Sequence, residues 1–215
     1  MTRIILLTFV LLATACATAT IPTSTLALHP KIEGTEQWFN SDKTFRLRHA
    51  GAITIGNEVI PINGFMELDM QRQSAKVAIL TGFGIKLANL VVNHSSAQIF
   101  DTSPIADQIP HFKSQCILSI RRMFLTDFPQ ANVIYTQSAT HEFTALTRNG
   151  ILSSLVDQPT GFVREKNFVS TEENWIVLYE GTVTIDGIQL PRQTTFFSSD
   201  KDYSVTLQLK NPDIP

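Results

Sequence analysis

The hydrophobic pattern of this chain changes its period twice, and the order of the periods restricts the folds open to it. In residues 44–100, apolar residues alternate with polar ones or form short apolar runs, which predicts β-strands. In residues 111–128 they recur every three or four positions, as in an amphipathic helix. After the helix the β pattern returns, in residues 142–147, 151–156, 175–185, 188–197 and 203–209. The sequence therefore predicts two antiparallel meanders separated by one helix.

The strand pattern also indicates how the sheet is buried. Phe45, Leu47 and His49 alternate with arginines, as in a strand with one buried face. Residues 75–81 and 85–92 are largely apolar on both faces, as in strands buried on both sides or facing lipid on one. A sheet with one helical insertion can wrap round the helix and keep a ligand cavity. The predicted fold is mainly β, a strongly curved antiparallel half-barrel with an amphipathic helical lid.

Composition excludes several classes of protein. Of the 215 residues, 17% are charged and 43% are hydrophobic, and 14 are phenylalanine. A disordered chain would show low hydrophobicity and high net charge. The formal net charge of −2 gives no electrostatic basis for binding nucleic acid.

The N-terminus reads as a targeting segment. An apolar run follows Arg3 and ends in small residues directly before Cys16. The run is too short to span a bilayer, which needs about 20 residues. We expect Cys16 to be lipidated; the alternative is an ordinary secretory signal cleaved near Ala15 or Ala17. The predicted organisation is a lipoprotein signal peptide (1–15), a lipidated tether (16–30) and a single domain (31–215).

No catalytic pattern stands out. The chain has no phosphate-binding glycine loop, no HExxH pair and no G-x-S-x-G elbow. With Cys16 lipidated, Cys116 has no disulfide partner and is expected to act as a small hydrophobe. The histidines are interpreted as structural or surface residues. We therefore expect no enzyme, no cofactor and no metal site.

One turn departs from the usual composition. Phe83 stands between Gly82 and Gly84 at the tip of a predicted hairpin, where a polar residue is expected. Its ring either folds back onto the sheet or projects outward as a contact for a membrane or a partner.

The chain resembles the LolA/LolB-like bacterial lipoprotein carriers. It most closely resembles a branch of LolB-like outer-membrane lipoproteins associated with aryl-polyene gene clusters. The segments that carry the resemblance are the small residues ending in Cys16, the Phe83 hairpin, Phe128-Pro129, Asn174-Trp175, Leu190-Pro191 and residues 203–209. The resemblance implies a hydrophobic cavity between sheet and lid that accepts acyl chains such as palmitate. It also implies an outward-facing Phe83 that helps deliver cargo to the membrane, and an outer-membrane anchor facing the periplasm.

The leading hypothesis is thus a non-enzymatic lipoprotein that binds or transfers an acyl chain, a lipid-like ligand or the acyl chains of a lipoprotein. The alternative is a structural or adaptor lipoprotein that binds a protein partner in cell-envelope assembly. The candidate cavity residues are Met66, Leu68, Val77, Ile79, Leu87, Ile120, Phe124 and Trp175.

Overall fold

Strands from both halves of the chain join in one continuous sheet. The computed structural model describes residues 36–126, 133–137, 140–147, 149–157, 160–198 and 202–210. Within these residues the sheet has 13 strands in the order β6-β5-β4-β3-β2-β13-β12-β11-β10-β9-β8-β7, with β1 paired in parallel to β12. The predicted signal peptide, Cys16 and the predicted tether lie outside the described residues.

The elements have the following bounds. The strands are β1 (Glu36–Gln37), β2 (Thr44–Ile55), β3 (Glu58–Asp69), β4 (Ser74–Thr81), β5 (Lys86–Asn93), β6 (Ala97–Thr102), β7 (Val133–Gln137), β8 (Thr140–Leu146), β9 (Ile151–Asp157), β10 (Val163–Val169), β11 (Asn174–Ile185), β12 (Ile188–Ser198) and β13 (Tyr203–Leu209). The helical elements are the 3₁₀ turn η1 (Trp38–Asn40), α1 (Pro104–Gln108), α2 (Phe112–Ile120) and the π-helical turn η2 (Arg121–Leu125).

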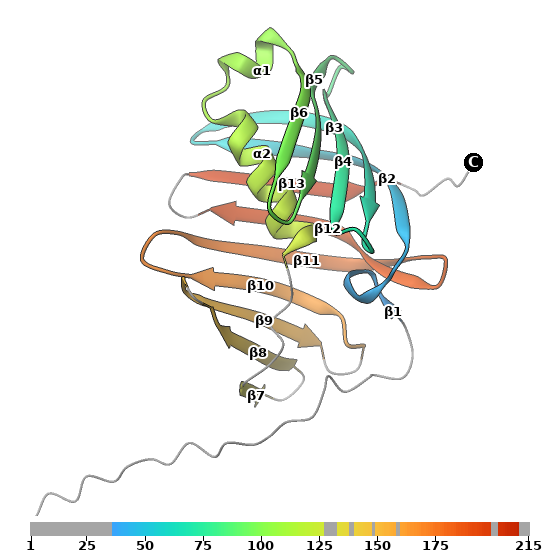
Figure 1. Ribbon diagram of the computed structural model, residues 1–215, viewed down its shortest axis with the longest axis vertical. Helices are drawn as coiled ribbons and strands as arrows, with labels where there is room; N and C mark the ends of the chain where they lie inside the picture. The colour runs from blue at the N-terminus through green and yellow to red at the C-terminus, as the bar shows by residue number, and fades with distance from the viewer. Residues whose placement is uncertain are drawn as a thin grey trace, which may run out of the picture.

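The sheet is strongly curved, and the helices lie on its concave side. β4–β6 run steeply across the direction of β10–β12, and α2 lies across the hollow between them (Figure 1). Each meander is built from consecutive antiparallel strands, and the antiparallel pairing of β2 with β13 joins the two. The predicted mainly β half-barrel with a helical lid is confirmed.

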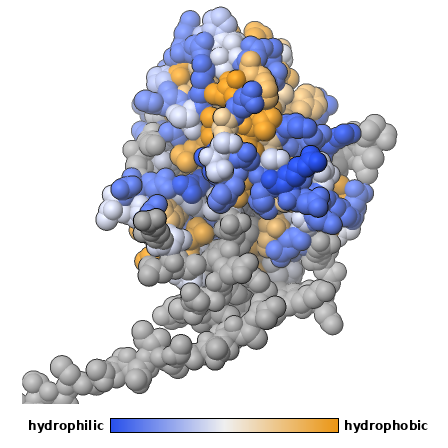
Figure 2. Space-filling view, in the orientation of Figure 1, coloured by the Kyte–Doolittle hydropathy of each residue, from blue (hydrophilic) through white to orange (hydrophobic). Residues whose placement is uncertain are grey.

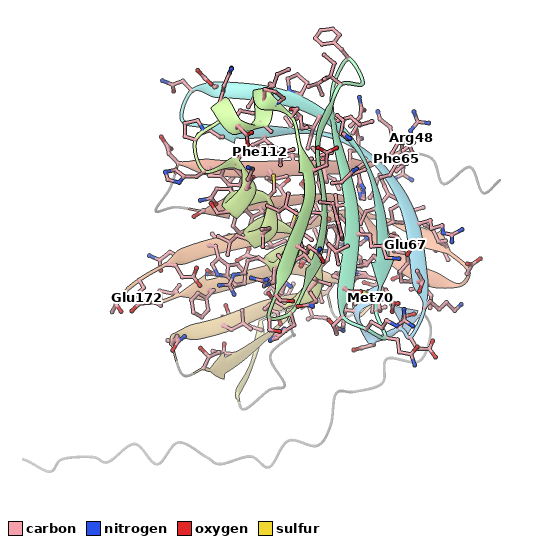
Figure 3. The ribbon with its side chains drawn as sticks, turned by 45° about the horizontal axis from the view of Figure 1, so that its top comes forward. Arg48, Phe65, Glu67, Met70, Phe112 and Glu172 are labelled. Atoms are coloured by element: carbon pink, nitrogen blue, oxygen red, sulfur yellow. The ribbon has the colours of Figure 1, made fainter. Side chains whose placement is uncertain are left out.

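Alternation along the strands separates an apolar inner face from a charged outer face. On β2, Phe45, Leu47 and His49 are buried, while the intervening arginines are exposed. On the outer face, the guanidinium of Arg48 lies 5.7 Å from the centre of the Phe65 ring (Figure 3). The inner face therefore needs a cover, and the helical segment provides it.

The helical segment differs from its predicted form. The sequence predicts one helix over residues 111–128 with Pro110 in its first turn, but α2 begins at Phe112, after Pro110 and after a left-handed His111 with φ 56°. The segment then widens into η2, where the Thr126 N–H donates to the carbonyl of Arg121, five residues back. Among the described residues, no helix is long and apolar enough to cross a membrane.

Five elements, β1, η1, α1, β7 and β10, were not foreseen from the sequence. The short helix α1 starts at a Ser103 N-cap, whose Oγ accepts from the Ala106 N–H at 3.2 Å, with Pro104 in the first turn. That Ser-Pro pair was a usable signal for it. β10 was missed because its buried Lys166 interrupts the apolar pattern.

Gly51 allows β2 and β13 to approach each other closely. A Cβ at this position would lie 1.8 Å from the backbone oxygen of Thr206 and 3.2 Å from the Cα of Leu207. Only glycine leaves room for the pairing that joins the two meanders.

We therefore expect Gly51→Ala to lower the free energy of unfolding by more than about 3 kcal/mol, measured by urea denaturation, since the clash is with backbone. Gly64→Ala is the matched control, because its nearest contact, 3.1 Å from the carbonyl oxygen of Ala78, requires a much smaller shift. Equal costs for the two variants would contradict this account of the joint.

Candidate functional site

An apolar cavity lies between α2 and the inner face of the sheet. Its volume is about 40 Å³. Residues of β2, β3, β4 and β13 form its floor, and residues of α2 and η2 form its roof. The lining residues are His49, Ala50, Ile53, Ile62, Asn63, Gly64, Phe65, Met66, Val77, Ile79, Cys116, Ser119, Ile120, Met123, Val205 and Leu207. The hollow is thus at the place where the sequence predicts a ligand site, but in this closed form it has room for little more than a water molecule.

Four of the eight candidate cavity residues line this hollow. They are Met66, Val77, Ile79 and Ile120. The other four, Leu68, Leu87, Phe124 and Trp175, are buried but are not among the lining residues. Alternation identifies which residues face inward, but it does not show which part of a long inner face remains uncovered.

An aromatic cluster explains the position of two of the four. Phe124 packs edge-on against Trp38 with ring centres 5.8 Å apart, and the Trp38 ring is 6.0 Å from Tyr179. Trp175 stacks on Phe168 at 5.6 Å. These rings fill the interior around η2, and the cavity lies beside them.

The two ends of the helical segment are held differently. At η2, Arg121 donates to the carbonyls of Asn93 and Ser96 at 3.0 and 3.1 Å. The hydroxyl of Tyr179 donates to the carbonyl of Met123 at 2.7 Å, and Arg122 forms an ion pair with Glu173. Polar contacts therefore fix η2 to the sheet and its turns.

The α2 end meets the sheet mainly through apolar side chains. Phe112, Cys116 and Ile120 are buried beneath it, and Phe112 stands at its start (Figure 3). Apolar contacts are non-directional and tolerate sliding or separation more readily than hydrogen bonds with fixed geometry. Fewer hydrogen bonds and ion pairs therefore join α2 to the sheet than join η2 to it.

A groove separates the N-terminal end of α2 from the sheet. Its volume is about 350 Å³, within the range of roughly 300–1,000 Å³ typical of ligand pockets. The groove is lined by Ile55, Pro110, His111, Ser114, Gln115 and Tyr203. The groove and the cavity are both lined by residues of β2, β13 and α2. They therefore lie one after the other along the helix.

Two titratable groups beneath the lid are held neutral. Burial lowers the pKa of His49 from 6.5 to about 4. Burial raises the pKa of the Cys116 thiol to about 12, with a smaller opposing effect from Tyr203. Cys116 is thus a buried thiol, in line with its reading as a small hydrophobe. The described residues contain no group of three His, Cys, Asp or Glu side chains that could hold a metal.

The Phe83 side chain projects from the molecule. It is 96% exposed, at the tip of the β4–β5 hairpin, and Ile85 beside it is 52% exposed. Figure 2 shows apolar side chains gathered on the upper half of the molecule, over the region of β5, β6 and α2. The exposed apolar side chains of the β4–β5 turn, β6 and α1 include Ile85, Phe100 and Ile105. The Phe83 ring therefore does not fold back onto the sheet.

Comparison with known proteins agrees with this architecture. No family model and no curated protein sequence matches the chain. The crystal structure of a LolA superfamily protein from Nitrosomonas europaea superimposes with a TM-score of 0.50 at 12% identity, covering 81% of this chain and 88% of that one. The chain has a LolA-like fold. A DUF1329 family protein from Desulfovibrio piger superimposes with a TM-score of 0.46 at 9% identity, covering 80% and 86% of the two chains.

His49 makes the stability of the LolA-like domain depend on pH. Because its pKa is about 4 when folded, the unfolded chain takes up a proton that the folded chain does not, between about pH 6.5 and 4. This contribution to stability is complete above that window and is lost as the pH falls through it, by up to about 1.4 kcal/mol per pH unit.

On lowering the pH from about 7 to about 5, the wild type should therefore lose about 2 kcal/mol more than His49→Leu, measured by urea unfolding. His94→Leu, in an exposed turn, is the matched control and should keep the wild-type pH dependence. An equal loss in wild type and His49→Leu would show that another group is responsible.

Proposed function

We propose that this chain belongs to the LolA/LolB-like proteins and is a lipid-anchored protein of the bacterial outer membrane that faces the periplasm. It binds an acyl chain or lipid-like ligand between α2 and the sheet, without covalent chemistry, cofactor or metal. The observation that carries the proposal is the apolar cavity under the helical segment. Hydrogen bonds hold this segment to the sheet at η2, while α2 contacts the sheet mainly through apolar side chains. Cys16 supplies the anchor and residues 16–30 the tether to the folded domain, which begins after them.

Binding requires the lid to open. The closed cavity of about 40 Å³ is far smaller than a ligand pocket, so α2 has to move away from the sheet to admit a chain. With η2 as the fixed end, lifting α2 joins the cavity to the groove at its N-terminus. Burial of a chain then stabilises the open form by about 0.8 kcal/mol per methylene.

The Phe83 hairpin serves delivery. A phenylalanine that is 96% exposed on a turn gains from insertion into a lipid surface and contributes nothing to the core. α1 lies at the same end of the molecule as the upper ends of β4 and β5 (Figure 1). The mobile end of the lid and the membrane contact would therefore meet the bilayer together.

Filling the cavity tests the binding site. In delipidated protein, Val77→Phe should abolish saturable uptake of a fluorescent fatty acid, because the larger side chain occupies the space under α2. Val91→Phe, on the neighbouring strand at a half-buried position that does not line the cavity, is the matched control and should bind as the wild type does. Absence of uptake by the wild-type protein would overturn the proposal.

Changing the hairpin tests delivery separately. Phe83→Glu should leave fatty-acid binding intact, because the side chain is outside the core. It should reduce transfer of bound probe to phosphatidylethanolamine–phosphatidylglycerol vesicles at least roughly tenfold, since a charge opposes insertion. Phe197→Glu, at another exposed phenylalanine, controls for added charge. Unchanged transfer, together with loss of a co-purifying protein, would favour the adaptor function instead.

A further inference from the structure

His49 is an exception within the cavity. It continues the inward-facing series of β2 and is 4% exposed, among side chains that are mostly aliphatic. In the described part of the chain, its imidazole forms no hydrogen bond, and burial alone accounts for its shifted pKa. A neutral imidazole carries one donor and one acceptor, and no hydrogen bond to another described residue uses either of them.

The neighbouring polar groups do not satisfy it. Ser119, which lines the same cavity, donates its hydroxyl to the carbonyls of Gln115 and Cys116 at 2.8 and 3.1 Å. Asn63 donates to the carbonyl of Gly82 at 3.4 Å. His49 therefore has hydrogen-bonding capacity that a ligand can use.

The position of His49 indicates which part of a ligand it meets. Ile55 lines the groove at the mobile end of α2, and Ile53 and His49 line the cavity farther along β2. Six residues of strand separate Ile55 from His49, about 20 Å at 3.3 Å per residue. A chain that enters at the groove and lies along the helix reaches His49 with its distal end, about the length of an extended sixteen-carbon chain.

We infer that the cavity selects a long-chain amphiphile that carries a hydrogen-bonding oxygen on the distal half of its chain, with His49 as the contact for that oxygen. This inference rests on the proposed acyl-chain binding and names its ligand class. A plain saturated chain leaves the imidazole unpaired, whereas a distal hydroxyl pairs with it. His49 is thus a specificity residue.

The test compares three ligands of equal chain length: palmitate, β-hydroxypalmitate and ω-hydroxypalmitate, each displacing a fluorescent fatty acid at neutral pH. The wild type should bind ω-hydroxypalmitate roughly three- to tenfold more tightly than the other two, the amount expected for one hydrogen bond. His49→Leu should lose this preference while binding palmitate at least as well. It should also unfold at a higher temperature when empty, which shows that the variant is folded.

His49→Gln keeps a donor and an acceptor and should retain part of the preference, while His94→Leu should retain all of it. Equal binding of the three ligands by the wild type, or a preference for β-hydroxypalmitate, would overturn the inference and leave acyl-chain binding standing. A preference that survives in His49→Leu would overturn it as well. Failure of all three ligands to displace the probe, or of the probe itself to bind, would overturn both proposals.

Discussion

The curvature of the sheet creates an apolar inner face that a short helical segment has to cover. The pairing of β2 with β13 fixes that curvature, because it joins two meanders that would otherwise be separate sheets. Gly51 permits the join by leaving no side chain against the backbone of Thr206. A straight helix cannot contact a curved sheet along its whole length. The cavity beneath α2 and the groove at its end are the spaces that remain between the two.

The distribution of polar contacts then decides which end of the cover moves. Arg121, Arg122 and Met123 are tied to turns and strands by hydrogen bonds and an ion pair, and the aromatic rings around Phe124 pack the interior behind them. α2 depends chiefly on apolar burial. Burial also lowers the pKa of the Arg122 guanidinium, which Glu173 partly offsets, so breaking this end would leave a charge without its partner. In the proposed opening of the lid, η2 is therefore the end that stays in place.

The sequence predicts the parts of this design that depend on local periodicity. Alternation on β2 is a local signal, and the structure contains the strand where this signal places it. The switch from α2 to η2 could not be read in the same way, because it arises where Arg121 reaches across to the β5–β6 turn. Such a contact joins residues far apart in sequence.

The candidate site was only partly predictable for the same reason. The two-residue period places Leu68 and Met66 on the same inner face, yet only Met66 lines the cavity, since the roof over each depends on α2. His49 belonged to the inward-facing series and was interpreted as structural. Its lack of a partner emerges only when the strands that surround it are assembled.

If the chain is a carrier, as proposed, its small cavity follows from competition between the lid and the ligand for the same apolar surface. Lifting α2 exposes Phe112 and Ile120, at about 1.5–3 kcal/mol each. A chain of about 14 methylenes gains about 11 kcal/mol if it is wholly buried, so it can offset that exposure with affinity remaining. When the chain leaves, the helix recovers the same surface, and no large empty cavity has to be maintained. In that competition, a ligand that forms a hydrogen bond with His49 would be favoured over one that does not.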